Sequence, residues 1–171
     1  MIGEKSFRYE ISLKQQLLLL GHLFFTTLFW IGFGVYNYYV YRWHWETYRT
    51  IFLFFFFIDI LPTIILHLQY LIKNWRATFF IFTEAKHLEY RKGCTVLSYS
   101  FEDIDSLQYF YNLGKGSGWN SFGEYRFYKI IFKDKTEMVI TCLMINDIEH
   151  TLEMLLGMKA EKRASILNLL E

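Results

Sequence analysis

The sequence predicts a membrane-spanning helical hairpin followed by a small antiparallel β-domain that ends in a helix. Three observations support this fold class. The N-terminal half holds two long stretches that are almost free of charge, short runs rich in aromatic and β-branched residues follow, and apolar residues take a helical spacing near the C-terminus. We therefore divide the 171-residue chain into a cytosolic N-terminal segment at 1–16, a two-helix transmembrane hairpin at 17–72 and a cytosolic β-domain at 73–171.

Two transmembrane helices are expected at about 17–40 and 50–72. No charged residue occurs from Gln15 to Tyr41, and Asp59 is the only one in the second stretch. A spanning helix needs about 20 mostly apolar residues, which each stretch supplies. A pair of buried core helices is the alternative, but core helices rarely run this far without charge. A cleaved signal peptide is disfavoured because the first apolar run is too long for one.

The distribution of basic residues predicts the orientation of the hairpin. The segments on its terminal side carry Lys5, Arg8, Lys14, Lys73 and Arg76, whereas the loop carries only Arg42 and Arg49. Because positive charge accumulates on the cytoplasmic side, we expect a two-pass protein of the bacterial inner membrane with both termini in the cytoplasm. The two cysteines, Cys94 and Cys142, are then expected to be reduced.

Six short strands are expected after the hairpin, separated by polar breaks of hairpin size. They cover 77–84, 87–91, 94–99, 106–112, 124–132 and 136–142. Closely spaced strands of this kind indicate an antiparallel barrel or sandwich. A helix should then begin near Asn146 and end at Gly157, which suits the C′ position, and a further helical segment is expected at about 159–170.

This order of elements resembles small bacterial membrane proteins that carry a pleckstrin-homology-like (PH-like) domain after two spans. The resembling text is RATFFIFTEAKHLEYRKGCTVLSYSFEDIDSL, which alternates strands with tight turns. The architecture is also similar to the two-transmembrane β-barrel effectors of cyclic-oligonucleotide antiphage systems, both CBASS and CRISPR-linked. That resemblance implies a cytosolic β-domain that senses a nucleotide messenger and spans that damage the inner membrane. It carries no ligand residue over to this chain.

Polar residues form one line on each expected helix. In the second span the line is Asp59, Thr63 and His67, and in the first it is His22, Thr26, Trp30 and Asn37. Folding the chain back at its loop places the two lines face to face, with Asp59 near the bilayer midplane. A charged Asp there costs about 2.5–3.5 kcal/mol, so it needs a partner. The expected partners are the Trp30 indole, Thr63 or polar groups of another subunit, and the two lines either satisfy each other or line the centre of a homo-oligomer.

The β-domain shows no catalytic, metal-binding or cofactor-binding motif, so we expect no enzyme and no cofactor, although a site assembled only by folding stays open. Its 13 basic and 13 acidic residues cancel, which disfavours polymeric nucleic acid. A small anionic ligand, such as a cyclic nucleotide, needs only a local pocket. The candidate ligand-binding residues are Arg91, Lys92, Tyr109, Tyr111, Lys115, Trp119, Tyr125 and Arg126.

The glycine-rich stretch 113–124 has two interpretations. Its backbone N–H groups and Lys115 suit a phosphate-binding loop, but a strand rather than a helix follows, which favours a long mobile hairpin loop. The leading functional hypothesis is an oligomerising membrane effector that a regulator switches to permeabilise the bilayer. The alternatives are a membrane-anchored PH-like module that binds a protein or a lipid headgroup, and a small transporter or channel subunit.

Overall fold

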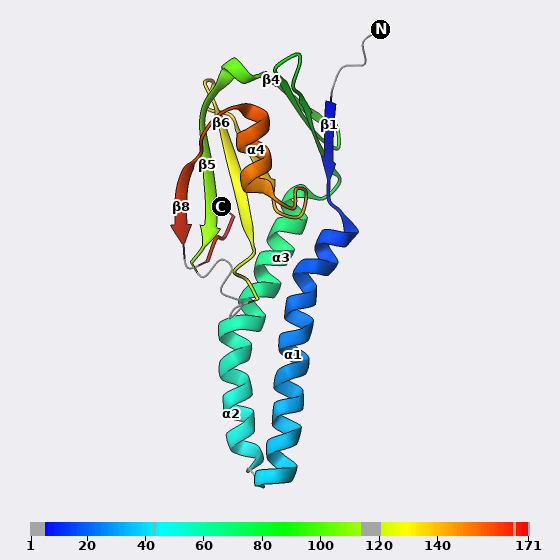
Figure 1. Cartoon of the computed structure of the whole chain (residues 1–171), viewed down its shortest axis with the longest axis vertical. Helices are drawn as coiled ribbons and strands as arrows, with labels where there is room; N and C mark the ends of the chain where they lie inside the picture. Colours follow the sequence, from blue (N-terminus) through cyan, green and yellow to red (C-terminus); the bar gives the residue numbers. More distant parts are fainter. Residues whose placement is uncertain (1–5, 43, 114–120, 166, 171) are drawn as a thin grey trace.

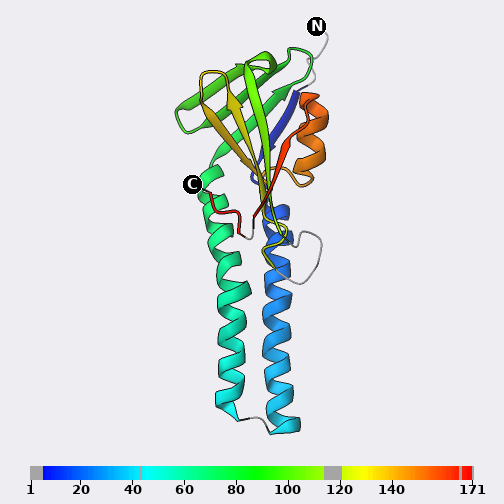
Figure 2. The ribbon, with the colours of Figure 1, turned by 90° about the vertical axis from the view of Figure 1, so that its left-hand side faces the viewer.

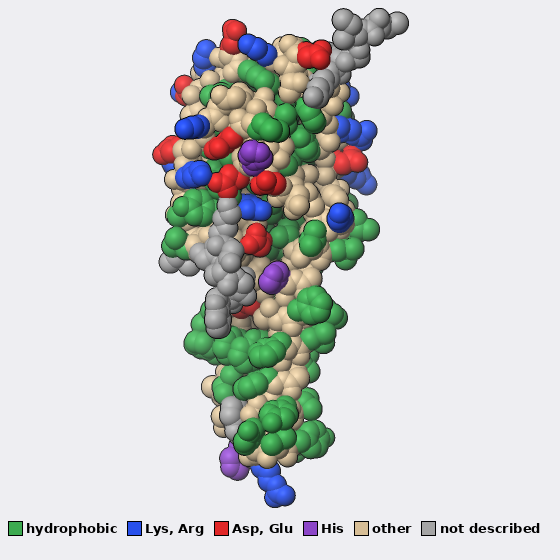
Figure 3. Space-filling model, in the orientation of Figure 1, with side chains coloured by type: hydrophobic (Ala, Val, Ile, Leu, Met, Phe, Trp, Pro, Cys, Tyr) green, Lys and Arg blue, Asp and Glu red, His purple; other side chains and the backbone are tan. Residues whose placement is uncertain are grey.

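The protein consists of a β-domain and a helical hairpin that projects from one end of it (Figures 1 and 2). The structure, a computed structural model, describes residues 6–42, 44–113, 121–165 and 167–170. Charged side chains gather over the β-domain and hydrophobic ones over the far part of the hairpin (Figure 3). The two parts therefore differ in surface chemistry, as a membrane hairpin and a water-exposed domain would.

Two helical legs make up the hairpin. The first is α1, Leu13–Tyr41, and the second runs without a break through α2, Trp45–Phe55, a π-helical turn, η1, Phe56–Ile60, and α3, Leu61–Asn74. Both legs are long and apolar enough to cross a membrane by length and composition. Each extends several residues beyond the range expected from sequence.

The π-helical turn has a local cause. Pro62 stands in the first turn of α3, and its ring lacks an N–H and crowds the carbonyl of Ile58. An α-helix that meets such an obstacle accommodates it by a wider turn or a kink. The widened turn contains Asp59, so proline and aspartate belong to the same irregularity of the helix.

Eight strands form two four-stranded sheets among the described residues. The first sheet has the order β1-β2-β3-β4 and the second β7-β6-β5-β8. The strand bounds are β1 Ser6–Glu10, β2 Ala77–Phe82, β3 His87–Lys92, β4 Thr95–Ser100, β5 Ile104–Asn112, β6 Arg126–Phe132, β7 Glu137–Thr141 and β8 Glu161–Ser165. All pairings are antiparallel except that of β5 with β8, and the short helix η2, Phe101–Asp103, joins the sheets. The six expected strands are present, but as two sheets and not as a closed barrel.

The hairpin is inserted within the first sheet. β1 pairs with β2 from Ser6 opposite Phe82 to Glu10 opposite Thr78, so the whole hairpin is the connection between two neighbouring strands. The sequence predicts a separate segment at 1–16, whereas Ser6–Glu10 forms β1 and α1 begins at Leu13. The strand Ser6–Glu10 is only five residues long, and no turn residues flank it in the sequence. The local sequence therefore does not predict it.

One core joins both sheets and α4, Ile148–Leu156, which lies between them in Figure 1. Ile148, Leu152 and Leu156 recur at helical spacing and are buried with the inward residues of both sheets. α4 ends at Gly157, whose φ of 64° is the left-handed conformation that glycine adopts easily. This helix is where the sequence predicts it.

The helix expected at 159–170 is wrong in the structure. Glu161–Ser165 is instead the edge strand β8, which pairs in parallel with Gln108–Asn112 of β5. The leucines that suggested a helical face lie beyond the strand, and Leu167 and Leu170 pack against a second core cluster. The free edge of β5 offers a row of unpaired backbone N–H and C=O groups. Hydrogen bonding to this edge outweighs the weak helical pattern of residues 159–170.

Candidate functional site

The candidate site is the junction where the β-domain contacts the upper hairpin. α3 places Leu66 and Tyr70 in a buried cluster with Tyr125, Phe127 and Leu143 of the β-domain. Its polar line follows the same face, because Thr63 and His67 are buried beside them. The line expected to face α1 therefore faces the β-domain.

Asp59 is held by a residue of the β-domain. Its carboxylate accepts a hydrogen bond of 2.7 Å from the Ser121 backbone N–H and one of 2.9 Å from the Ser121 hydroxyl. Thr26 on α1 lies 3.3 Å from the same hydroxyl, so three segments meet at this point. Asp59 is only 7% exposed. Its charge is thus compensated by two short hydrogen bonds in a buried place, which is what a buried carboxylate requires.

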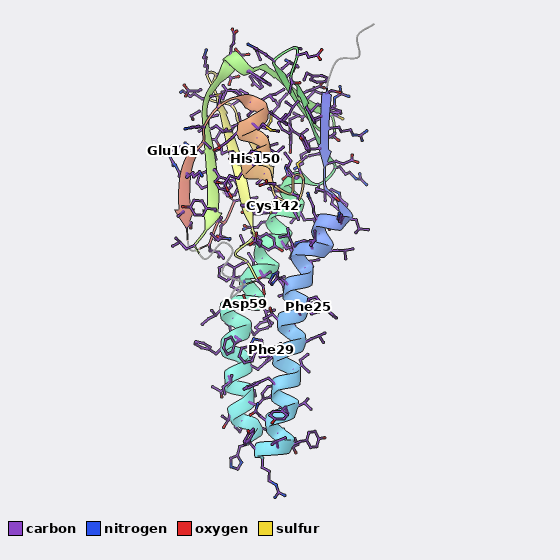
Figure 4. The ribbon with its side chains drawn as sticks, in the orientation of Figure 1. Phe25, Phe29, Asp59, Cys142, His150 and Glu161 are labelled. Atoms are coloured by element: carbon purple, nitrogen blue, oxygen red, sulfur yellow. The ribbon has the colours of Figure 1, made fainter. Side chains whose placement is uncertain are left out.

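In the described structure neither Thr63 nor the Trp30 indole, two of the partners expected from sequence, binds this carboxylate. Thr63 donates to the backbone carbonyl of Asp59 and not to its carboxylate. The Trp30 ring stacks on Phe55, with 3.7 Å between the centroids. In Figure 4 Asp59 lies on the second leg at the level of Phe25 on α1, below the β-sheets.

His67 and Tyr70 add two further ties between α3 and the β-domain. His67 Nδ1 lies 2.9 Å from the Tyr125 hydroxyl, and the Tyr70 hydroxyl donates to the Asn168 carbonyl. Burial raises the pKa of Tyr125, so its hydroxyl keeps its proton at neutral pH. His22, on the line of α1 predicted to face this one, is exposed.

Asn112 organises the segments that reach the junction. Its side-chain amide donates to the carbonyls of Phe122 and Tyr125, and its oxygen accepts from the backbone N–H of Asn168. Asn112 thus joins the end of β5, the segment that carries Ser121 and the C-terminal segment. Asn112 and Ser121 were missed because nothing in their local sequence signals contacts with residues more than fifty positions away.

The lower hairpin has few polar contacts between its legs. Asn37 donates to the carbonyl of Phe33 one turn earlier, so its amide is satisfied within α1. Gly34 lies against the Tyr48 ring, and the Tyr48 hydroxyl donates to the Trp30 carbonyl at 3.3 Å. Glycine is needed at residue 34 because the ring occupies the space of a side chain.

The described residues of the expected ligand-binding set are spread over both sheets. Arg91 and Lys92 lie on β3 of the first sheet. Tyr109 and Tyr111 lie on β5 and Arg126 on β6 of the second sheet, and Tyr125 directly precedes β6. Arg91 is an ion-pair partner of Glu89 and holds the pKa of that carboxyl below its usual range. Lys92 donates to the Lys73 carbonyl at the end of α3, where a cation is favourable. Lys115 and Trp119 lie outside the described residues.

The tyrosines of that set are structural. Tyr109 is buried and stacks on Tyr128 with 4.9 Å between ring centroids, and Tyr111 stacks on Tyr109 in turn. The Tyr125 hydroxyl is the hydrogen-bond partner of His67 Nδ1. Arg126 lines a cleft beside α1.

Comparison with known proteins gives one family. A family model described as a PH domain matches residues 8–151, which is most of the chain. The matched interval begins in β1 and ends in α4, so it encloses the hairpin and leaves β8 outside. No match was found among curated proteins or among solved structures.

Proposed function

This chain belongs to the PH-domain family, and we propose that it acts as a membrane-anchored PH-domain interaction module. The hairpin between β1 and β2 is the anchor, and the β-domain presents its surface away from the membrane to a partner. In this proposal the protein is non-enzymatic, lies in a bacterial inner membrane and keeps both termini in the cytoplasm. The observation that carries it is the insertion of an apolar hairpin between two paired strands.

This placement couples anchor and domain without a flexible linker. Both legs emerge from neighbouring strands, and Ser121, Tyr125 and Asn168 fix the second leg against the β-domain. The domain therefore has a defined orientation relative to the bilayer. A tethered domain on a loose linker would lack this property.

The junction also sets how close the domain sits to the membrane. From Thr26 to Tyr41, α1 covers about 24 Å, whereas the hydrocarbon core is about 30 Å thick. The rim of the β-domain must then enter the interfacial layer. Leu113, which follows the end of β5 nearest the hairpin (Figure 1), is about half exposed and suits that position.

The anchor is tested on the full chain. We expect the protein to stay in the membrane pellet after alkaline carbonate extraction. In a Cys94→Ser background, Arg42→Cys should react with an impermeant maleimide from outside intact spheroplasts. Native Cys94, which is exposed on the domain, should react only after lysis. Recovery of the protein in the carbonate supernatant would overturn the anchor.

A second candidate, a regulated permeabilising effector, is favoured by one observation. Asp59 is the single acidic residue of its leg between Glu46 and the end of α3, and only the β-domain residue Ser121 supplies hydrogen bonds to its carboxylate in the described structure. A regulator that displaced Ser121 would free a carboxylate within an apolar hairpin. Several hairpins in a homo-oligomer could then line a pore, and a cyclic nucleotide, as in antiphage effectors, is the ligand class to test.

Two substitutions at the same contact separate the candidates. In liposomes loaded with a self-quenching dye, an effector should leak more with Ser121→Ala, which loosens the hold on Asp59. It should leak less with Asp59→Ala, which removes the charge that would line the pore. A plain anchor should leave the dye inside in both cases, and equal leakage from the two variants would refute the effector role.

A further inference from the structure

An aromatic pocket lies near the turn of the hairpin, at the end farthest from the β-domain (Figure 1). Four of its lining residues, which we call the aromatic cage, are Tyr38 and Tyr39 from α1 and Trp45 and Tyr48 from α2. The pocket has a volume of about 330 Å³, within the range of about 300–1,000 Å³ that small-molecule sites occupy. Both legs of the hairpin therefore contribute walls to one pocket.

The rings of the aromatic cage are inclined to one another. Tyr38 and Tyr39 lie edge to face, with 5.3 Å between their centroids and 85° between their planes. Trp45 is tilted by 46° against Tyr48 at a centroid distance of 5.5 Å. The Tyr48 ring lies directly over Gly34, and its hydroxyl donates to a backbone carbonyl of α1 at 3.3 Å. Contact with α1 thus fixes the ring of Tyr48 as one wall.

A pocket with aromatic walls selects a cation without hydrogen-bond donors. The face of each ring carries partial negative charge, which attracts a cation placed over it. None of the described residues that line the pocket is acidic, so ring faces rather than a carboxylate would hold the cation. Quaternary ammonium groups suit such cages best. Tyr and Trp are common at membrane interfaces, but that preference alone does not require rings from two helices to converge.

A second pocket adjoins the aromatic cage and adds positive charge. It shares three of the aromatic residues, and Arg42 and His44 complete its lining. Basic and histidine side chains lie at this tip of the hairpin beside hydrophobic ones (Figure 3). Glu46, the one acidic residue between positions 15 and 58, pairs with Arg49 and not with Arg42. The Arg42 guanidinium would repel a simple cation, but it would bind a carboxylate carried by the same molecule.

We propose that the two pockets together bind a small betaine, a solute that carries a trimethylammonium group and a carboxylate. The trimethylammonium group lies in the aromatic cage, and the carboxylate accepts hydrogen bonds from the Arg42 guanidinium. With the orientation proposed above, the site opens on the outer side of the membrane, where a free solute reaches it. The site includes no residue of the β-domain, so it goes beyond the proposed interaction module.

Saturation-transfer NMR of the full-length protein in dodecyl maltoside tests the site with glycine betaine as the probe. We expect saturation to pass from the aromatic protons to the trimethyl signal. Two analogues should bind about tenfold more weakly: glycine, which lacks the methyl groups, and 3,3-dimethylbutanoate, in which carbon replaces the charged nitrogen. Choline should also bind more weakly, because it meets Arg42 without a carboxylate.

Substitutions in the aromatic cage have a matched control on the same helix. Tyr39→Leu removes one wall and should raise the dissociation constant for glycine betaine about three- to tenfold. Tyr36→Leu should leave it unchanged, since Tyr36 is also an exposed tyrosine of α1 but lines neither pocket. Trp45→Leu should act like Tyr39→Leu from the other leg. Circular dichroism melting shows whether each variant keeps its fold.

Arg42→Gln gives a readout that loss of structure would not produce. It should weaken glycine betaine about tenfold, because a charge-assisted hydrogen bond is lost, and it should leave choline binding equal or stronger. Arg49→Gln, which removes a guanidinium already paired with Glu46, is the control and should change neither ligand. Parallel losses of both ligands in Arg42→Gln would contradict the role of Arg42.

Three further results would overturn the proposal. They are the absence of saturation transfer in the unsubstituted protein, binding of 3,3-dimethylbutanoate as tight as that of glycine betaine, and equal losses in Tyr36→Leu and Tyr39→Leu. Nanodiscs decide whether the ligand is a free solute. If added phosphatidylcholine displaces glycine betaine there, the cage takes a choline headgroup and the free-solute assignment is wrong.

Carbonate extraction separates this proposal from the anchor. A protein that stays in the membrane pellet but shows no transfer to glycine betaine keeps the anchor and loses the site. A protein that carbonate extracts, but that binds glycine betaine with the expected response to Tyr39→Leu and Arg42→Gln, keeps the site and loses the anchor.

Discussion

Ser121 donates two hydrogen bonds to the carboxylate of Asp59, at 2.7 Å and 2.9 Å, across a separation of 62 residues in sequence. This contact fixes Ser121 of the β-domain on the π-helical turn of the hairpin. It explains how an acidic residue persists in the middle of an apolar helix, because the β-domain supplies the donors that lipid cannot. It also makes the stability of the hairpin and of the domain depend on each other.

Ser121→Ala should lower the free energy of unfolding by about 1.5–3 kcal/mol. The variant removes one hydrogen bond to a buried charged group and leaves the backbone donor in place. Equilibrium unfolding of the purified protein in detergent measures the change. Ser98→Ala, whose hydroxyl contacts His87 on the exposed face of β4, is the matched control and should stay within about 0.5 kcal/mol. Equal losses for both serines would contradict the role of the Asp59 contact.

Tyr125→Phe should cost about 1–3 kcal/mol because it leaves the buried His67 Nδ1 without its 2.9 Å partner. Adding His67→Leu should recover part of this loss, since removing both polar partners avoids an unsatisfied group. Tyr99→Phe, whose hydroxyl donates to exposed Asp134, provides the control. Thermal unfolding in detergent of the wild type, Tyr125→Phe, His67→Leu and the double variant gives the coupling. Strictly additive losses would show that the two residues do not interact.

Gly34→Ala should separate the legs of the hairpin near its turn. A Cβ at this position would overlap the Tyr48 ring, so the helices or the ring must move. Gly32→Ala faces open space two residues away and should leave the helix spacing unchanged. Electron paramagnetic resonance distances between spin labels at Tyr39 and Thr47 report the change, which should appear for Gly34→Ala alone. A shift of the same size in Gly32→Ala would point to a general effect of alanine on α1.

Cys94 and Cys142 should differ sharply in reactivity. Cys94 is exposed at the β3–β4 turn, whereas burial raises the pKa of the Cys142 thiol to about 11. Because the thiolate is the reactive form, a disulfide reagent at about pH 8 should modify one thiol per native chain and two in denaturant. Cys94→Ser should abolish the native signal. Rapid modification of Cys142 in that variant would show that the junction opens on the time scale of the reaction.

Much of the architecture follows from local sequence. The two stretches that are almost free of charge have the length and composition of spanning helices. The strand-like runs from Ala77 to Thr141 and the helix that ends at Gly157 have a periodicity or a terminating residue that short-range physics explains. β8 could not be predicted in the same way, because its pairing depends on the free edge of β5 and not on its own residues. β1 depends likewise on β2, from which the hairpin separates it.

The sequence by itself predicted that Asp59, Thr63 and His67 share one face of a helix, because residues four apart lie on the same side of an α-helix, and all three are buried although Asp59 lies in the π-helical turn. Only the tertiary structure decided what that face meets. Sequence reasoning looked to the other leg or to another subunit, whereas Ser121 and Tyr125 of the β-domain occupy the face. Helical spacing is a property of the local chain, but partners depend on how the sheet places its connections. The hairpin is thus held by the domain into which it is inserted.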